Sequence, residues 1–144
     1  MTKSNIISIP LEKYETTEGA LFPIYKDWDD AHSNHIPKMI YVTTMNPLTE
    51  KGPILHLERN EFVTAITGVV DVEFLIDEKI VTYKLCDNNS SQILKIPAGI
   101  PKKFINKSDE VATIINAPDR AWHPDNEDTY KFRSWDEYTT SFEA

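Results

Sequence analysis

Cysteine, glycine and long apolar runs are all scarce in this sequence, and each scarcity excludes a class of protein. The single cysteine, Cys86, cannot form an internal disulfide or a C-x-x-C redox pair, and its apolar, alternating surroundings indicate burial rather than reactivity. Only four glycines are present, and none builds a phosphate-binding glycine loop. No apolar run approaches the roughly 18 residues that cross a bilayer, and residues 1–10 lack the apolar core of a signal peptide. We therefore expect a soluble cytoplasmic protein with no membrane partner.

Basic residues are also in the minority, with 15 lysines and arginines against 23 acidic residues and a formal net charge of -8 at pH 7. A nucleic-acid backbone requires a basic face, so the composition argues against a nucleic-acid partner. Four cations nevertheless lie in or beside the segments 51–61 and 97–106: Lys51, Arg59, Lys102 and Lys103. They predict a basic mouth on an acidic body, unless they are ordinary solvated side chains.

Short runs rich in Val, Ile, Thr and Tyr recur between turn-forming residues, and no long helical period competes with them. A length of 144 residues is that of one domain, so residues 1–144 are expected to form a single all-β barrel. Residues 27–35 are expected to form a loop or a single helical turn, and residues 119–144 to wrap the barrel. The predicted strands are Ile6–Pro10, Ala20–Tyr25, Met39–Met45, Gly52–Leu57, Glu61–Thr67, Val69–Ile76, Ile80–Leu85, Ser91–Ile96, Lys102–Asn106 and Val111–Asn116.

Two segments resemble, in their spacing, the two halves of the cupin signature. Residues 52–68 follow the pattern H-x-H-x(3,4)-E-x6-G, and residues 97–106 follow P-x-G-x2-H-x3-N. Ile54 replaces the first histidine and Lys102 the last one, so His56 and Glu61 alone remain of the four usual metal ligands. A cation at a ligand position repels a divalent ion. The resemblance implies a double-stranded β-helix, or jelly-roll barrel, and the substitutions predict no metal and no cofactor.

Alternation along a strand places Ile54 with His56, and Lys102 with Phe104, on the inner face of such a barrel. A buried ammonium needs an anion, so Lys102 should pair either with Glu61 or with a phosphate or carboxylate of a ligand. His56 has two readings that the sequence leaves open. It is either a hydrogen-bonded histidine of the packed interior or a general acid or base, with Glu61 near enough to fix one tautomer.

Other polar side chains give weaker signals. Asn116 stands at the end of a predicted strand and is expected to reach the mouth of the barrel. The tyrosines Tyr41, Tyr83 and Tyr130 could act as acids or could pack. Three histidines are expected at the surface: His32 and His35 solvated in a polar loop, and His123 either on the surface or in a lid.

Several short segments follow one another along the chain: Ile9–Tyr14, Glu18–Phe22, Ile36–Val42, Lys51–His56, Ile96–Gly99, Asn106–Glu110, Ile115–Pro118 and His123–Asp128 with Asp136. Their order resembles that of the small RmlC-like sugar-nucleotide cupins. These are related to dTDP-4-dehydrorhamnose 3,5-epimerase and include the WxcM-like and dTDP-sugar 3,4-ketoisomerase branch. The resemblance implies a metal-free cupin, usually dimeric, that binds a nucleotide-diphosphate sugar and moves protons beside a 4-keto group.

The chain departs from this family where the family's base is expected, because Ile54 occupies that histidine's place and Lys51 replaces an arginine near phosphate. For an isomerase, proton removal then passes to His56, with Lys102 as enolate stabiliser or acid and Tyr41 as a second acid. The substrate is expected to be a small molecule, a dTDP-sugar, held in a homodimer. The residues expected to bind it are Lys51, Arg59, Glu61, Phe104 and Asn116.

Two alternatives remain open on the sequence. A barrel that has lost catalysis would bind a sugar or a small anion as a sensor, carrier or accessory subunit. Alternatively, a barrel without the metal site could catalyse another metal-free isomerisation, cyclisation or lyase step on a hydrophobic substrate, since Ile54 makes the cavity less polar.

Overall fold

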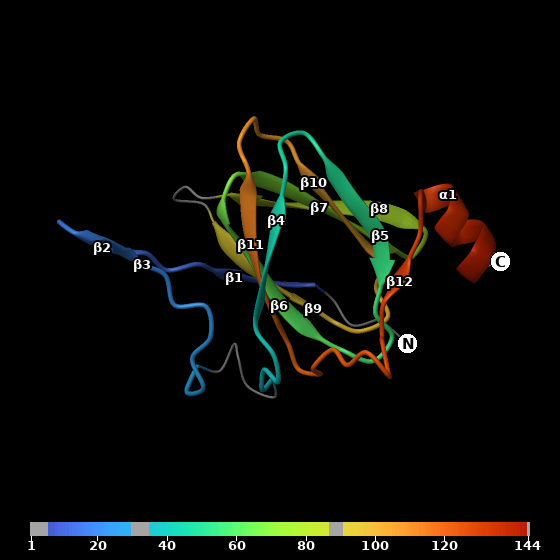
Figure 1. The fold of residues 1–144 in the computed structure, drawn as a ribbon, viewed down its shortest axis with the longest axis horizontal. Helices are drawn as coiled ribbons and strands as arrows, with labels where there is room; N and C mark the ends of the chain where they lie inside the picture. Colours follow the sequence, from blue (N-terminus) through green and yellow to red (C-terminus); the bar gives the residue numbers. More distant parts are fainter. Residues whose placement is uncertain (1–5, 30–34, 87–90, 144) are drawn as a thin grey trace.

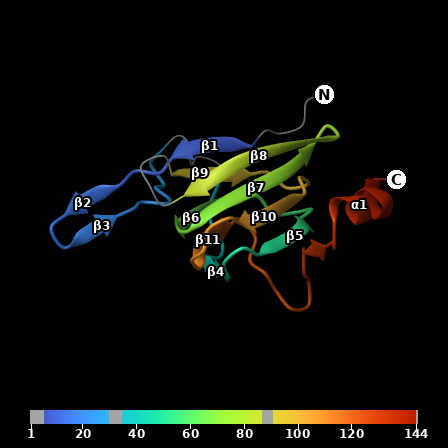
Figure 2. The same ribbon diagram turned by 90° about the horizontal axis from the view of Figure 1, so that it is seen from above.

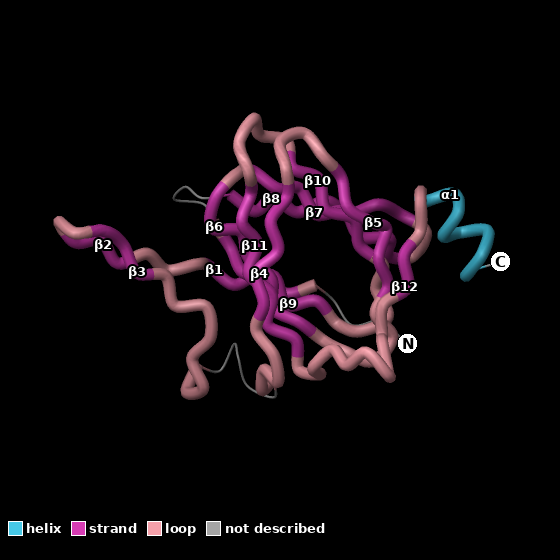
Figure 3. The backbone as a smooth tube through the Cα atoms, viewed as in Figure 1, coloured by secondary structure: helices cyan, strands magenta, loops and turns pink. Residues whose placement is uncertain are grey.

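The computed structural model describes residues 6–29, 35–86 and 91–143, and most of its regular structure is antiparallel strand. Two 5-stranded sheets face each other and form the body of the molecule (Figures 1 and 3). This arrangement confirms the expected all-β jelly-roll barrel. The first sheet has the order β1 (Ile7–Pro10), β9 (Gln92–Ile96), β6 (Glu61–Thr67), β11 (Ala112–Pro118), β4 (Tyr41–Met45). The second has the order β12 (Tyr130–Lys131), β5 (Glu50–Leu55), β10 (Lys102–Asn106), β7 (Val69–Ile76), β8 (Lys79–Cys86).

The main core lies between the two sheets and takes apolar side chains from both. Val63 and Ala65 of β6 meet Val70 and Phe74 of β7, and all four are fully buried. Within β6, Val63 and Ala65 are two residues apart, and within β7, Val70 and Phe74 are four residues apart. These spacings keep both side chains on one face of a strand. Removing these side chains from water supplies the main force that holds the sheets together.

The strands β6, β7 and β10 have the bounds that the sequence predicts. The prediction for Ala20–Tyr25 is wrong, because the strand β3 covers only Gly19–Leu21 and ends before Pro23. Proline lacks the N–H that continues a ladder, which is consistent with that end. Cys86 is buried, as expected. Residues 87–90, whose Asp, Asn and Ser side chains are typical of a turn, lie outside the described part of the chain.

A hairpin near the start of the chain and the helical turns at its end lie outside the two main sheets. β2 (Tyr14–Thr16) and β3 form a hairpin that stands away from the barrel (Figures 1 and 2). At the other end, β12 pairs with β5, and the tail continues into the short helix α1 (Trp135–Tyr138) and the π-helical turn η2 (Thr139–Glu143). The tail therefore follows the barrel only as far as β12, and its helical end extends from the barrel edge instead of wrapping it (Figures 1 and 2). None of the helices in the described residues is both long enough and apolar enough to cross a bilayer.

Candidate functional site

A cavity of about 300 Å³ lies at the inner face of the barrel. β4, β5, β6, β10, β11 and β12 all contribute to its wall, together with the loop that follows β5. All eight residues that the sequence nominates for catalysis or binding line this one cavity, although their roles remain predictions. The lining consists of Met39, Tyr41, Lys51, Ile54, His56, Arg59, Glu61, Lys102, Phe104, Asn116, Trp122, Thr129 and Lys131.

The pairing of β5 with β10 sets the inner wall of the cavity. Ile54 lies opposite Lys102 in this pair, so the two side chains project into the barrel together. Gly52 is needed at the point where the two strands approach. Its φ is +110°, and a Cβ added there would lie 2.8 Å from the carbonyl oxygen of Lys102.

Asp128, which is not among the site residues predicted from the sequence, holds the loop after β5 in place. Its carboxylate accepts hydrogen bonds from the backbone N–H groups of Leu57 (2.9 Å), Glu58 (2.9 Å) and Arg59 (3.1 Å). The backbone carbonyl of Asp128 also accepts a hydrogen bond from His56 Nδ1 at 2.6 Å. One residue of the tail therefore fixes both the loop and the orientation of the histidine.

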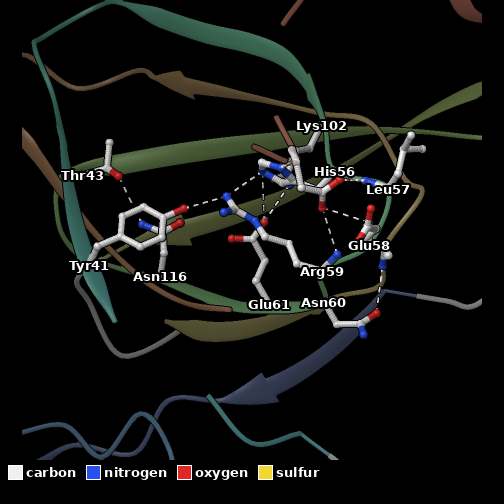
Figure 4. Close-up of polar contacts among 12 residues, drawn as sticks. Tyr41, Thr43, His56, Leu57, Glu58, Arg59, Asn60, Glu61, Lys102 and Asn116 are labelled. Carbon is white, nitrogen blue, oxygen red and sulfur yellow. Dashed lines mark hydrogen bonds and ion pairs between the residues drawn. The ribbon is translucent and has the colours of Figure 1, made fainter. Parts of the chain in front are cut away.

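An ion pair between Glu61 and Lys102 lies at the floor of the site (Figure 4). Lys102 Nζ lies 2.8 Å from Glu61 Oε2, and the two residues are 3% and 1% exposed. The pairing is one of the two alternatives that the sequence left open for Lys102. Burial raises the pKa of Glu61, but the Lys102 ammonium outweighs burial and the net pKa lies below its usual value. Burial lowers the pKa of Lys102, and Glu61 partly offsets this.

His56 is a neutral imidazole whose two nitrogens are both engaged (Figure 4). Because Nδ1 donates to the carbonyl of Asp128, the remaining lone pair is on Nε2, and it accepts a hydrogen bond from Arg59 Nη2 at 2.8 Å. Glu61 Oε2 is 3.7 Å from Nε2 and does not fix the tautomer, contrary to the expectation. Burial lowers the pKa of His56 to about 4, and the Lys102 charge contributes further. In this geometry the main role of His56 is to orient the Arg59 guanidinium through the hydrogen bond at Nε2.

Arg59 also donates to the hydroxyl oxygen of Tyr41 at 3.0 Å. Burial raises the pKa of Tyr41 to about 12, with a further contribution from the Glu61 charge. The phenol is therefore protonated at neutral pH, and its own proton can be directed to a ligand while its oxygen accepts from Arg59. On the same side of the cavity, where β11 pairs with β4, Asn116 Nδ2 donates to Thr43 Oγ1 at 3.3 Å, which holds the amide in the wall.

The cavity is strongly basic for a protein with a net charge of -8. Four cationic side chains line it, Lys51, Arg59, Lys102 and Lys131, against the carboxylate of Glu61. Burial lowers the pKa of Lys51, and repulsion from Lys131 adds to this. The expected basic mouth is thus present. Lys103, also expected there, is instead paired with Glu50 at 2.7 Å and is not part of the lining.

The three histidines that were expected at the surface differ in outcome. His35 is only 1% exposed, which overturns the prediction of a solvated side chain. Its Nε2 donates to the carbonyl of Ala117 at 2.9 Å, and its ring lies against Phe62 at 4.1 Å between centroids. His123 is exposed and lies outside the cavity lining. His32 lies outside the described residues.

The metal-site prediction concerns the two former ligand positions, His56 and Glu61. Within the part of the chain that the structure describes, no group of three or more His, Cys, Asp or Glu side chains could hold a metal ion. Two other histidines that could supply further ligands, His35 and His123, do not line the cavity.

Sequence reasoning missed five residues that complete the site. Asp128 and Thr129 precede β12, Lys131 lies on it, and Trp122 and Met39 lie in irregular segments. These segments carry no alternating pattern, so the signal was weak. The one sequence signal for Asp128 is its place in the segment His123–Asp128, which carries part of the family resemblance.

The chain matches a protein-family model over nearly its whole length. The family model described as WxcM-like, C-terminal (FdtA) matches residues 2–141. No curated protein is significantly similar to the chain.

Solved structures with the same fold share little sequence with the chain. A dTDP sugar isomerase from Desulfovibrio desulfuricans G20 has a TM-score of 0.79 and 14% identity, over 88% of this chain and 83% of that one. QdtA, a sugar 3,4-ketoisomerase from Thermoanaerobacterium thermosaccharolyticum in complex with TDP, has a TM-score of 0.72 and 17% identity, over 94% and 93%. The epimerase RmlC from Legionella pneumophila Philadelphia 1, in complex with dTDP-4-keto-L-rhamnose, has a TM-score of 0.75 and 12% identity, over 91% and 74%.

Proposed function

Because the chain belongs to the WxcM-like, C-terminal family, we propose that it is a metal-independent isomerase or epimerase of a nucleotide-linked 4-keto-6-deoxy sugar, acting in the cytoplasm. The observation that carries the proposal is the excess of positive charge in the cavity of an acidic protein. Lys51 and Lys131 form no ion pair within residues 6–29, 35–86 and 91–143, so both are open to an anionic ligand. A nucleoside diphosphate carries the charge that such a pair recognises.

The reaction requires removal of the acidic proton beside the ketone and stabilisation of the enolate that results. Lys102 is suited to the second task, because its buried ammonium is held at a fixed place by Glu61. Tyr41 is suited to return a proton, since its pKa is raised to about 12 by burial and it therefore keeps its hydrogen at neutral pH. Ile54 and Phe104 form an apolar part of the wall, which strengthens each of these interactions by limiting water.

The proposal is tested with dTDP and dTDP-4-keto-6-deoxyglucose. We expect both to raise the melting temperature, because a ligand that binds only the folded state stabilises it. In heavy water the keto sugar should exchange hydrogen for deuterium at C3 or C5, which proton NMR detects. Absence of binding by both compounds would remove nucleotide sugars as ligands.

A second candidate is a non-catalytic barrel that binds a nucleotide sugar or another small anion. It is favoured by Ile54 at the position of the family's base and by the engagement of the His56 lone pair with Arg59. This candidate expects binding of dTDP-4-keto-6-deoxyglucose without exchange. Stabilisation by apolar compounds alone would instead indicate the recruitment of the barrel to a hydrophobic substrate.

We also propose a homodimer, supported by the β2–β3 hairpin. All its strand residues are exposed, including the cross-strand pair Tyr14 (54%) and Leu21 (61%). An isolated two-stranded hairpin is at best marginally stable in water, so a surface on a second copy would stabilise it. Light scattering should give twice the mass of the 16.6 kDa chain, and replacing Leu21 by Lys should lower that mass. A monomeric wild-type protein would contradict the proposal.

A further inference from the structure

The side chains that line the cavity differ in whether they can accept a proton from a substrate. The lone pair of His56 on Nε2 already accepts from Arg59 at 2.8 Å. Tyr41 keeps its proton, since burial raises its pKa to about 12. Glu61 differs from both. Its Oε2 lies 2.8 Å from Lys102, whereas its buried Oε1 has no hydrogen-bond partner among the described residues.

An unpartnered carboxylate oxygen in a buried wall is costly and calls for an explanation. Water or a ligand must satisfy Oε1, and Glu61 belongs to the cavity lining. The carboxylate is also in its basic form at neutral pH, because the Lys102 ammonium overcomes the effect of burial and the pKa of Glu61 lies below its ordinary value of 4.5.

We propose that Glu61 is the catalytic base of this site and that Lys102 is the cation that receives the charge of the enolate. The inference rests on the proposed function. Glu61 Oε1 removes the proton from the carbon beside the ketone, and the electron pair of that C–H bond forms the C=C bond of the enolate. The π electrons of the ketone move to its oxygen, which faces the Lys102 ammonium.

The enolate can then be reprotonated in either of two ways. In an isomerisation, Glu61 returns its proton to the former carbonyl carbon. The carbon that lost the first proton carries a hydroxyl group. This hydroxyl transfers its proton to the former carbonyl oxygen, so a new ketone forms at that carbon and a hydroxyl forms at the former carbonyl carbon. In an epimerisation, Tyr41 supplies a proton from the other face, and Glu61 passes its own to the resulting tyrosinate through the solvent.

The ion pair explains why the reaction is tolerated in a buried site. When Glu61 takes the proton, its negative charge disappears and an equal charge forms on the enolate oxygen beside the same ammonium. The net charge of the cavity is unchanged, so no isolated charge is created in a medium of low dielectric constant. A fixed cation aimed at the developing charge is the arrangement that stabilises such a transition state.

The test is deuterium exchange into dTDP-4-keto-6-deoxyglucose by the wild type and by matched variants. Glu61→Gln keeps the shape but not the base, and we expect exchange to fall by about 10²–10⁴-fold while dTDP still raises the melting temperature. Glu78→Gln makes the same chemical change in an exposed turn and should leave exchange unaltered. His56→Gln retains an amide oxygen for Arg59, and exchange should fall by less than about tenfold.

The outcomes separate the two proposals. If the wild type binds dTDP but does not exchange, the proposed function fails and the assignment of Glu61 falls with it. If the wild type exchanges and Glu61→Gln exchanges within tenfold of it, the assignment alone fails. If Glu61→Gln does not fold, His56→Gln decides: a loss of about 10²–10⁴-fold with dTDP binding intact would make the histidine the base.

Discussion

Replacing Asp128 by alanine is the most direct test of how the site is held. The carboxylate accepts three backbone hydrogen bonds from the loop after β5, at 2.9, 2.9 and 3.1 Å. A hydrogen bond to a charged group contributes about 1.5–3 kcal/mol. Water can replace part of the loss at Leu57 and Glu58, which are exposed. We therefore expect Asp128→Ala to lower the free energy of unfolding by about 3–4 kcal/mol.

That loss is large against the total stability of about 5–15 kcal/mol expected of a domain. It should lower the melting temperature by about 10 °C. Urea denaturation followed by tryptophan fluorescence measures the free energy directly. Asp125→Ala is the matched control, because its side chain lies in the same segment and is 90% exposed. It should change stability by less than about 0.5 kcal/mol.

The pH dependence gives an independent check on the same carboxylate. Burial raises the pKa of Asp128, but the three N–H groups outweigh burial and the net pKa lies below its ordinary value of 3.8. The stabilisation is therefore complete above about pH 4 and is lost as the pH falls through the lowered pKa. The difference between wild type and Asp128→Ala should shrink in that range. A difference below about 1 kcal/mol at pH 7 would refute the view that Asp128 holds the loop.

Three further measurements test other parts of the site. Glu61→Gln and Lys102→Met should each lower the free energy of unfolding by about 3–5 kcal/mol, and the double variant should lose clearly less than the two together. Additive losses in urea denaturation would show that the pair is not coupled. Burial lowers the pKa of His56 from 6.5 to about 4, so the unfolded state takes up a proton that the folded state does not. Stability should therefore fall by up to about 3 kcal/mol as the pH drops from 6.5 to 4, and His56→Gln should reduce this loss; equal pH profiles would contradict it. Finally, Gly52→Ala should lose more than about 2 kcal/mol, since its Cβ would lie 2.8 Å from a backbone oxygen, whereas Gly99→Ala meets no atom within 4 Å and should lose about 1 kcal/mol. Equal losses for both would exclude a steric cause.

The sequence predicted the long strands well, because their alternation is a local property. Residues 61–67, 69–76 and 102–106 have clear alternation or compact apolar runs, and β6, β7 and β10 match them. The strands β2 and β12 have three and two residues, which is too short for a period of two to show. Such strands form only because a partner strand lies beside them, and a single sequence does not reveal that partner.

The site was predicted to a similar extent, and for a similar reason. Motif spacing predicted Glu61 and Lys102 in one cavity, and the cost of a buried ammonium made their pairing one of the two alternatives for Lys102; the structure shows this pair. The spacing gave no information on Asp128, which is 72 residues from its partner His56. It also missed the burial of His35, which follows a polar segment but whose ring lies against Phe62. Contacts between distant segments decide both cases.

The hydrogen bonds that Asp128 forms with His56 and with the loop after β5 have a consequence for the synthesis of the protein. A ribosome must add 72 residues after His56 before the carbonyl that orients this histidine exists. Until then the nascent barrel has neither the β12 edge nor the tail that completes its cavity. The ability to bind a ligand therefore arises late in translation, and a shortened product ending before residue 128 would retain most strands while lacking a finished pocket.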